Sequence, residues 1–510
     1  MQKKPITNKV LWIFAVGQFG WSLLSGIIST WLVHLYTGAP EKFGDTNGLF
    51  ADFISQHALI AGLTLFGIIT AVGRLFDAVT DPLIASWSDK ANFKGGRRIP
   101  FMKWIAIPFA AVTVAVFIVP QFSNVVVNDI LIFVLLMFFY LFMTIYCTPY
   151  NALIAELGDT QVHRINVSTY ISFTYIAGFS LSTLIPSLAG MFQGSKISDI
   201  LSQVAAENSL TLETLNEQLA NKTVLIKDVA SAEQIAQMQS VQQQSFYFAI
   251  GIMAAVACIA MLIPALFIKE RAYIDSKPVK THAFKSLVKT FGNAQFRRFV
   301  YADVIYFFAV TLFQTGLADY ETKLMGISSD NTFMLTVLMT VISLALYPAV
   351  NGLARKTGKK TLIIIGFFTY SAVFLITSLT GQGLIWGIIV ACCAGIPMAI
   401  LGILPQACVA DVSELSTLQT GEDRSGMFFA ARTFAMKLGQ ALSLLIYTSV
   451  TVSTIVDGEK YVSQTQYRAT AVIATAACLI GAVLFLFYNE KKIMNEIESL
   501  KGANAENKDA

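Results

Sequence analysis

Apolar segments long enough to cross a lipid bilayer recur along the whole chain of 510 residues. A membrane-spanning helix needs about 20 consecutive, mostly apolar residues. Hydrophobic residues make up 55% of the sequence and charged residues only 13%, whereas a soluble domain carries about 25% charged residues. This composition argues against a soluble enzyme. It predicts an all-α membrane protein with twelve transmembrane helices, at residues 10–36, 57–87, 103–121, 129–154, 167–190, 245–268, 297–320, 332–354, 361–379, 384–410, 427–452 and 466–488.

Basic residues are distributed unequally over the loops between these segments. An even number of spans places both termini on one side, and the loops on that side contain most of the lysines and arginines. Short loops rich in Lys and Arg stay in the cytoplasm. We therefore expect a multi-pass protein of the plasma membrane, or of a bacterial inner membrane, with both termini cytoplasmic. The first apolar segment is too long for a cleavable signal peptide.

A basic stretch after the sixth apolar segment divides the chain into two six-helix halves. The basic turn from Ser88 to Arg98 in the first half is echoed by the turn from Gly352 to Lys360 in the second, as expected of a parallel repeat. The predicted parts are an N-terminal half, a cytoplasmic linker, a C-terminal half and a cytoplasmic tail, at residues 1–268, 269–296, 297–490 and 491–510.

Residues 191–244 form a polar insertion in the first half, on the side opposite the termini. Leucines recur at helical spacing between positions 212 and 219, and Ser231 with Gln234 fits a helix capping box. We expect short amphipathic helices that cap the bundle. A domain that captures the solute is the alternative interpretation.

The second apolar segment carries three charged residues in its middle, Arg74, Asp77 and Asp81. Each charge at the centre of a bilayer costs roughly 2.5–3.5 kcal/mol, so their presence requires a reason. Their spacing places all three on one helical face. Two carboxylates one turn apart beside Thr80 provide an oxygen-rich cation site, and Pro82 frees a backbone carbonyl nearby. An ion pair of Arg74 with Asp77 that serves burial alone is the alternative, although it leaves Asp81 without a partner.

Three blocks of the sequence resemble the glycoside-pentoside-hexuronide:cation symporters, the melibiose-permease branch of the major facilitator superfamily. The blocks are the segment from Ala71 to Phe101, the turn PYNALIAEL that starts at Pro149, and the stretch from Asp411 to Lys437. The resemblance implies a major facilitator fold and a cation site made of Asp77, Asp81 and Thr144, with Thr80 where some members have Asn. It also implies that Lys437 lies near the cation and the solute.

Melibiose-type members have acidic residues on helices 1 and 4 that bind galactosyl hydroxyls. This chain has Trp21 and Ser22 at the first place and Cys147 at the second, so a galactoside is not expected. An aromatic ring can still stack on a sugar, and amides and hydroxyls can contact its hydroxyl groups. The candidate substrate-binding residues are Gln18, Trp21, Ser22, Cys147, Tyr150, Asn151, Gln314 and Lys437. Arg432, nearer the end of its segment, is expected to snorkel to the membrane surface.

Charges of both signs lie at the expected cytoplasmic ends of the helices. The resemblance implies that they form an ion-pair network between the halves, which closes the cytoplasmic side and breaks when that side opens. Solvated charges at helix ends are the alternative. The expected gating residues are Asp89, Arg97, Arg98, Arg164, Arg355, Asp411, Glu414 and Arg424.

These observations predict a monomeric symporter in which inward movement of Na⁺ or H⁺ drives uptake of a small hydroxylated or anionic solute, with a sugar or glycoside favoured. A carrier of lysolipids or other amphiphiles is the nearer alternative, because apolar residues replace the sugar-binding carboxylates. A membrane-embedded enzyme is the distant one, since the four histidines and six cysteines show no catalytic or metal-binding spacing. We expect no enzymatic activity, no nucleic-acid partner and no cofactor besides the coupling cation.

Overall fold

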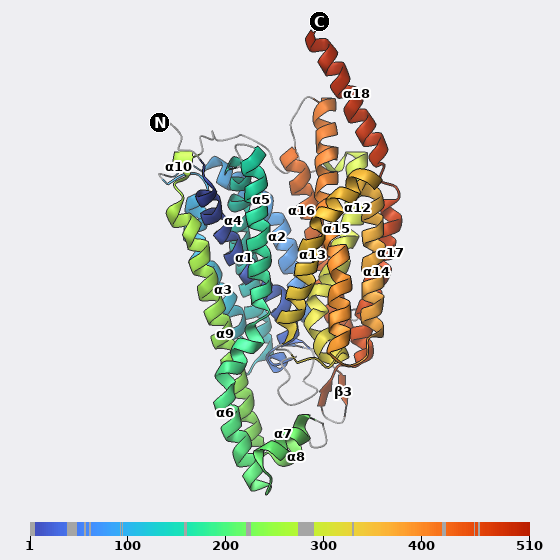
Figure 1. The fold of residues 1–510 in the computed structure, drawn as a ribbon. Helices are drawn as coiled ribbons and strands as arrows, with labels where there is room; N and C mark the ends of the chain where they lie inside the picture. Colours follow the sequence, from blue (N-terminus) through green and yellow to red (C-terminus); the bar gives the residue numbers. More distant parts are fainter. Residues whose placement is uncertain are drawn as a thin grey trace.

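Two helical bundles stand side by side and make up the molecule (Figure 1). The computed structural model describes residues 6–37, 48–55, 58–60, 63–91, 93, 95–157, 161–220, 226–273, 290–328, 331–420, 425–452, 454–456 and 459–509. Both termini lie on one face, called here the terminal face. The opposite face, called the insertion face, bears the projecting helices α6 to α8 (Figure 1).

The first bundle contains the helices that precede the linker. Helix α1 packs against α5 and α9, α2 packs against α4, and α3 packs against α4 and α9. The insertion face carries a short turn, η1, and a hairpin of two strands, β1 and β2, which pair antiparallel. The elements are α1 (Asn8–Tyr36), η1 (Ala51–Phe53), β1 (Ala58–Ile60), β2 (Leu63–Thr64), α2 (Leu65–Lys90), α3 (Ile99–Ile118), α4 (Val125–Leu157), α5 (Gln161–Ser182), α6 (Ile185–Glu207), α7 (Leu212–Ala220), α8 (Ile226–Val229), α9 (Ala232–Phe267) and α10 (Glu270–Tyr273).

The second bundle repeats this arrangement. Helix α12 packs against α16 and α17, and α14 packs against α15 and α17. Its elements are α12 (Ala294–Asp319), the π-helical turn η2 (Tyr320–Leu324), α13 (Thr332–Thr357), α14 (Lys359–Leu379), α15 (Leu384–Thr420), α16 (Ser425–Val450), β3 (Thr454–Val456), β4 (Glu459–Tyr461), α17 (Gln464–Phe485) and α18 (Glu490–Asp509). Most of the predicted linker, residues 274–289, lies outside the described residues.

Ten stretches of the described chain are long and apolar enough to cross a membrane. The two remaining segments of the predicted twelve correspond to α2 and α16, each a helix of 26 residues. These two helices carry charged groups in mid-helix and pack against each other across the halves. Shielding by the other helices explains how such polar helices are accommodated in an otherwise apolar bundle.

The insertion is built differently from the expectation of short helices alone. Helices α7 and α8 are short, but α6 and α9 continue without a break from the bundle into the insertion. Ser231 and Gln234 form the predicted capping box at the start of α9. A small core separate from that of the bundle, which includes Leu201, Val204 and Leu215, holds the four helices together.

A glutamate that follows the last long helix of each half supports the sequence repeat between the halves. Glu270 accepts hydrogen bonds from the backbone N–H groups of Arg98 (2.8 Å) and Ile99 (3.0 Å) at the start of α3. Glu490 accepts them from Lys359 (3.0 Å) and Lys360 (2.8 Å) at the start of α14. A carboxylate at a helix N-terminus satisfies free N–H groups and complements the helix dipole.

The turn before each of these helices contains a glycine with a positive φ, Gly96 at 126° and Gly358 at 86°. A side chain on either would be strained, and on Gly96 its Cβ would lie 2.4 Å from a carboxylate oxygen of Glu270. The matched glycines and glutamates show why the two basic turns resemble each other in sequence.

Candidate cation site between the halves

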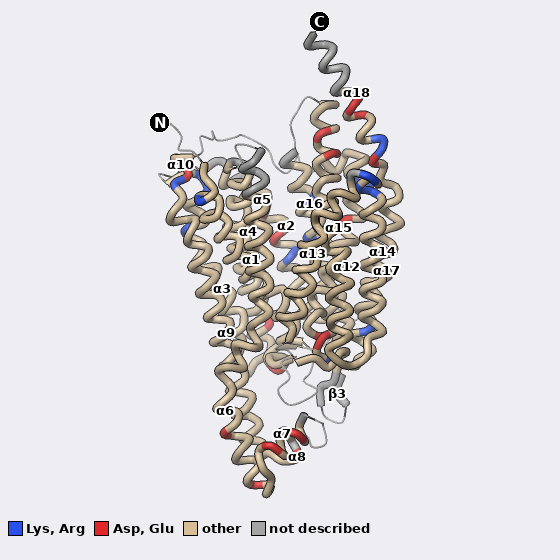
Figure 2. Tube along the Cα trace, in the orientation of Figure 1, with Lys and Arg blue, Asp and Glu red and all other residues tan. Residues whose placement is uncertain are grey.

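Charged residues lie mostly at the two ends of the bundles, but one cluster of both signs lies at mid-height between them (Figure 2). This cluster is formed where α2 of the first half meets α16 of the second. Its members are Arg74, Asp77, Asp81 and Lys437, and hydroxyls from α4 join them. The helical spacing of the three α2 residues places them together on the face that α4 and α16 cover.

Asp77 is fully buried at the centre of this cluster. One of its carboxylate oxygens, Oδ1, accepts a hydrogen bond from Thr144 Oγ1 at 2.6 Å and lies 2.9 Å from Lys437 Nζ. The other oxygen, Oδ2, has no hydrogen-bond partner among the described residues and lies 3.9 Å from Arg74 Nη1. The Asp77 carboxylate therefore has one oxygen that can still accept a hydrogen bond or a cation.

Asp81 lies one turn further along α2 and is the more accessible carboxylate, with 26% of its side chain exposed. Its Oδ2 accepts a hydrogen bond from Lys437 Nζ at 2.6 Å, and its Oδ1 accepts one from Thr148 Oγ1 at 3.3 Å. Pro82 lies within α2 and cannot donate to the carbonyl one turn earlier, so the helix has a free backbone oxygen here. A cation that enters from water would meet Asp81 first.

Two hydroxyls complete the oxygen-rich surroundings. The Thr80 hydroxyl donates to the backbone carbonyl of Asp77 on the same helix (3.1 Å), and Thr80 Oγ1 lies 3.4 Å from Thr144 Oγ1. Thr80 therefore reaches the cation site through Thr144 and the backbone in this conformation. The structure brings together all four residues predicted for the site: Asp77, Thr80, Asp81 and Thr144.

Arg74 contributes a second positive charge and is held by more than Asp77. Its guanidinium lies 5.0 Å from the centre of the Tyr140 ring and 3.5 Å from Ser29 Oγ. With Arg74 and Lys437 positive and Asp77 and Asp81 negative, the four charges sum to zero. The cluster therefore holds its charges in balance without an ion, and the ammonium of Lys437 occupies the space between the two carboxylates.

The residues predicted to bind substrate fall into two groups. Tyr150 is buried, its hydroxyl donates to the carbonyl of Phe14 (2.9 Å), and the two rings stack at 4.2 Å. It therefore holds α4 against α1 in this conformation. Ser22 donates to the carbonyl of Phe19, three residues earlier on α1, and Gln18 accepts a hydrogen bond from Trp21 Nε1 at 3.1 Å.

Four other members of the set are more accessible than these three. Asn151 and Gln314 are exposed, and Trp21 and Cys147 are half-buried. Cys147 lies on α4 between the two threonines that bind the carboxylates. Lys437 is the member that makes direct contact with the cation site. Contact of these residues with a solute stays a prediction.

The predicted gating residues are described only in part. Arg97 and Arg98 are buried in the turn before α3, and Glu414 is exposed on α15. Asp411 forms an ion pair with Lys359, which belongs to the same half. An inter-half network at the terminal face therefore stays a prediction. The side chains of Asp89, Arg164 and Arg355, and all of Arg424, lie outside the described residues.

Sequence reasoning missed the partner of Arg432. Its guanidinium donates from Nε and Nη2 to both carboxylate oxygens of Asp303 on α12, at 2.9 and 3.0 Å. The rings of Phe299 and Phe307 lie 5.9 and 5.6 Å from the guanidinium carbon. The expectation that Arg432 snorkels to the surface is therefore wrong, because a buried carboxylate is present at its own depth. Asp303 within a predicted span was the signal that could have revealed the pair.

A second inter-half contact involving charged groups lies nearer the insertion face. His34 Nδ1 on α1 lies 2.5 Å from Asp319 Oδ1 at the end of α12, and the Tyr447 hydroxyl of α16 donates to the other oxygen. All three side chains are buried. This group, called here the His34 latch, links the halves on the insertion side of the cation site. His34 and Asp319 are 285 residues apart in the chain, so no local sequence pattern predicts their contact.

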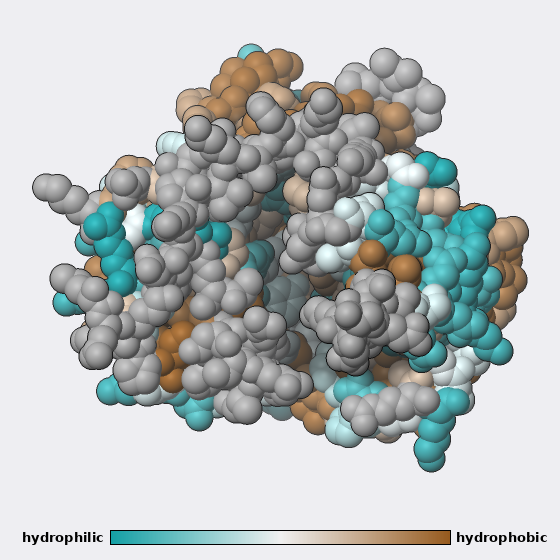
Figure 3. All heavy atoms as spheres, turned by 90° about the horizontal axis from the view of Figure 1, so that it is seen from above, coloured by the Kyte–Doolittle hydropathy of each residue, from teal (hydrophilic) through white to brown (hydrophobic). Residues whose placement is uncertain are grey.

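Helices α2 and α16 also approach closely near the insertion face. A Cβ added to Gly67 of α2 would lie 2.1 Å from Thr448 Oγ1 of α16. Seen from the terminal face, the surface of the molecule is hollowed near its centre (Figure 3). The inter-half contacts of charged groups among the described residues lie at mid-height and toward the insertion face.

Comparison with known proteins agrees with this architecture. A model of the family described as MFS/sugar transport protein matches residues 13–488. The chain belongs to this family. The sodium-dependent lysophosphatidylcholine symporter 1 of Xenopus tropicalis is 24% identical over 496 residues, covering 93% of this chain and 90% of the relative. An uncharacterised symporter of Synechocystis is 23% identical over 490 residues, covering 87% of this chain and 85% of that one.

Solved structures of other transporters share the fold of this MFS protein. The nucleoside transporter NupG superimposes with a TM-score of 0.59 at 11% identity, covering 95% of this chain and all of NupG. A bacterial homologue of the human lysosomal transporter Spinster, in an inward-facing conformation, also gives 0.59 at 14% identity, covering 96% and 97% of the two chains. The predicted major facilitator fold of the all-α membrane class is confirmed.

Proposed function

We propose that this MFS protein is a cation-coupled symporter in which Asp77 and Asp81 bind Na⁺ and Lys437 neutralises them when the ion is absent. The observation that carries the proposal is the position of the Lys437 ammonium, within 2.9 Å of Asp77 and 2.6 Å of Asp81. An ammonium between two carboxylates marks a place where a cation is stabilised. Sodium-dependent symporters among the relatives support Na⁺ rather than H⁺.

Entry of Na⁺ changes the balance of charge. The cluster already sums to zero, so a bound Na⁺ leaves one excess positive charge in a buried site unless Lys437 withdraws from at least one carboxylate. Lys437 belongs to α16 and the carboxylates belong to α2, so this withdrawal weakens an ion pair between the halves. Ion binding and the relative position of the halves are thereby coupled.

The freed ammonium supplies the link to the solute. The ammonium attracts an anionic or hydroxyl-rich group: an anion offsets the excess charge left by Na⁺, and hydroxyl groups accept hydrogen bonds from the ammonium. Each ligand then binds better when the other is present, which is the thermodynamic condition for symport. We infer uptake of a small hydroxylated or anionic solute, with Asn151 and Gln314 as exposed polar groups available to contact it.

A lysophospholipid is the second candidate for the solute. Trp21 and Cys147 stand where a sugar-binding site would carry carboxylates, and both are half-buried and uncharged. The phosphate of a lysophospholipid would meet the ammonium of Lys437, and its acyl chain would need apolar surface. The name of the Xenopus tropicalis relative supports this candidate.

The two candidates separate in a transport assay with purified protein in liposomes. Accumulation of labelled glycosides, hexuronates and lysophosphatidylcholine is measured with an inward Na⁺ gradient, with K⁺ in place of Na⁺, and with a pH gradient alone. We expect one solute class to accumulate only with the Na⁺ gradient, and Asp81→Asn to abolish this accumulation. Accumulation driven by the pH gradient alone would replace Na⁺ by H⁺. Equal transport by wild type and Asp81→Asn would refute coupling through α2.

A further inference from the structure

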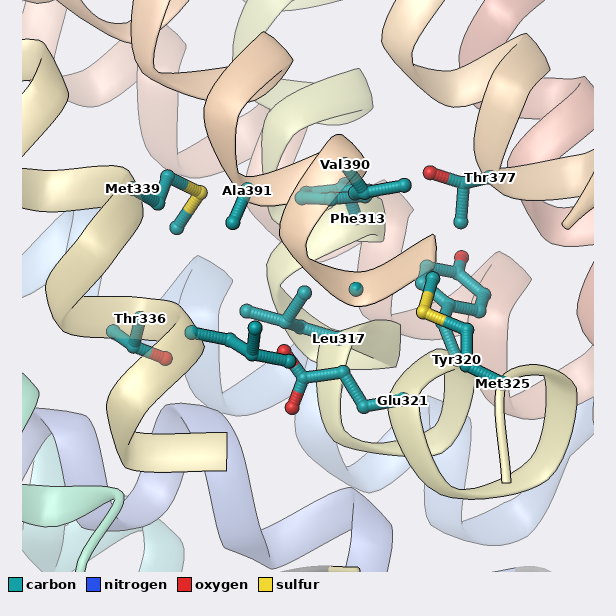
Figure 4. Close-up of a pocket in the computed structure, with 12 residues that line it drawn as sticks. Phe313, Leu317, Tyr320, Glu321, Met325, Thr336, Met339, Thr377, Val390 and Ala391 are labelled. Carbon is teal, nitrogen blue, oxygen red and sulfur yellow. The ribbon is translucent and has the colours of Figure 1, made fainter. Parts of the chain in front are cut away.

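The second half contains a small pocket that the cation site does not use. It lies among α12, η2, α13, α14 and α15, near the insertion end of the bundle (Figures 1 and 4). Most of its walls are apolar, with Leu317, Met339 and Val390 among them. The carboxylate of Glu321 lies at this pocket, beside Leu317 (Figure 4). Glu321 is only 3% exposed.

Three buried oxygen atoms at this place lack hydrogen-bond partners among the described residues. They are Oε2 of Glu321 and the hydroxyls of Thr332 and Thr336. The two threonines are one helical turn apart on α13, and Thr336 lines the pocket with Glu321. The Thr332 hydroxyl lies close to the carboxylate without a well-formed hydrogen bond to it. Buried polar groups are nearly always paired, so three orphaned oxygens together indicate a missing ligand.

The chemistry of the pocket selects the ligand. A buried carboxylate without a paired cation is strongly unfavourable in its charged form. Hard metal cations such as Ca²⁺ and Mg²⁺ are held by six or more oxygens, and this pocket offers one carboxylate and two hydroxyls within largely apolar walls. A proton needs only the carboxylate. The acid that forms can donate a hydrogen bond to the Thr332 hydroxyl, which pairs the carboxyl oxygen and that hydroxyl.

We propose that Glu321 is a proton-binding site in the second half, distinct from the Na⁺ site on α2. In the structure described here it carries its proton. The site lies on η2, a π-helical turn between α12 and the loop that precedes α13. Such turns interrupt the regular ladder of helix hydrogen bonds and are frequent at functional positions.

The Glu321 site is adjacent in the chain to the His34 latch. Asp319, two residues before Glu321, faces His34 of α1 and Tyr447 of α16. Tyr320 also lines the pocket, and its hydroxyl bonds to Thr470 of α17.

The remaining charged groups of the region are held elsewhere or lie outside the pocket wall. Arg468 of α17 donates to the carbonyls of Ser378 and Thr380 at the end of α14. Lys323 is buried on the same turn as Glu321 and is not among the residues that line the pocket. A deprotonated Glu321 would thus add a negative charge near Asp319 without a paired cation among the described lining residues. Retention of the proton therefore avoids an added negative charge beside the His34 latch.

Infrared difference spectroscopy of the full chain in liposomes tests the site directly. A protonated carboxylic acid in an apolar pocket gives a C=O stretching band that a carboxylate lacks. We expect the wild type to show this band at neutral pH, and Glu321→Gln to lose the intensity of one carboxylic acid. Glutamine has the size and neutrality of the acid, so its thermal stability should match that of the wild type.

Thr332→Val gives a second, independent test. This variant keeps Glu321 and removes the hydroxyl that lies close to its carboxylate, so the band should remain and shift in frequency. Glu414→Gln removes an exposed carboxylate and should leave the band unchanged. The proposal is overturned if Glu321→Gln keeps the full band. It is also overturned if Na⁺ removes the Glu321 band from the wild type, since the site would then hold a metal ion. Neither result depends on the Na⁺ site of α2.

Discussion

Replacement of Lys437 by glutamine tests whether the Lys437 ammonium competes with Na⁺ for Asp77 and Asp81 or helps these carboxylates to bind the ion. The Lys437 ammonium pairs with Asp77 and Asp81 at 2.9 and 2.6 Å. Removal of one partner from a buried ion pair costs about 3–5 kcal/mol, because the other charge remains buried. Asp81 is 26% exposed and water relieves part of this cost, so we expect a loss of roughly 3 kcal/mol in Na⁺-free buffer.

Added Na⁺ should reverse this loss. A ligand present at a hundred times its dissociation constant stabilises the folded state by about 2.7 kcal/mol, which nearly equals the expected deficit. Without the competing ammonium, Lys437→Gln should also bind Na⁺ at least tenfold more tightly than the wild type, a difference of about 1.4 kcal/mol. Thermal unfolding in detergent at a fixed heating rate, across a Na⁺ titration with choline as the balancing cation, measures both effects.

Arg432→Gln is the matched control for this experiment. This substitution breaks another buried ion pair of α16, the one between Arg432 and Asp303, at a similar cost in the free energy of unfolding. That pair lies within the second half and away from the carboxylates of α2. The melting temperature of Arg432→Gln should fall and Na⁺ should not restore it. A smaller Na⁺ response in Lys437→Gln than in the wild type would contradict the competition, because Lys437 would then assist ion binding.

Two further variants test the closure of the insertion face and the repeated glutamate. Gly67→Ala places a methyl group 2.1 Å from Thr448 Oγ1. Overpacking costs about 1–3 kcal/mol, so the population should shift roughly 5- to 150-fold toward opening of the insertion face. Distances between spin labels placed across that face measure the shift. The double variant Gly67→Ala with Thr448→Ala should restore the wild-type distances. Unchanged distances in Gly67→Ala alone would be evidence against the close contact of α2 with α16. Glu490→Gln weakens two charged hydrogen bonds to the start of α14 and should lower the free energy of unfolding by about 1–3 kcal/mol. Glu498→Gln, on the exposed face of α18, should leave unfolding unchanged, and equal melting of both variants would show that the cap adds no stability.

The sequence was informative where a residue type was out of place in its segment. Asp77, Asp81 and Lys437 are charges in apolar helices, and that anomaly alone marked them before any contact was known. The repeated basic turns likewise predicted two related halves. Thr144 carries no such anomaly, because threonine is common in membrane helices, and it entered the predicted site only through the family resemblance.

The sequence was uninformative where function depends on which helices face each other. His34 and Asp319 are far apart in the chain, and either looks like an ordinary polar residue near the end of a span. Glu321 lies one residue beyond the predicted seventh span, so its burial could not be predicted from the sequence. The sequence also does not show which hydroxyls are already engaged: the Tyr150 hydroxyl donates to the backbone of α1 in this conformation, and its contact with a solute stays a prediction.

Calorimetric titration of Na⁺ into the purified wild type, Asp77→Asn and Asp81→Asn measures ion binding at α2 without knowledge of the solute. We expect a saturable heat of Na⁺ binding in the wild type that both substitutions abolish, while circular dichroism shows all three proteins equally folded. Saturable Na⁺ binding that survives in both folded variants would place the ion away from α2 and refute a Na⁺ site made of these two carboxylates.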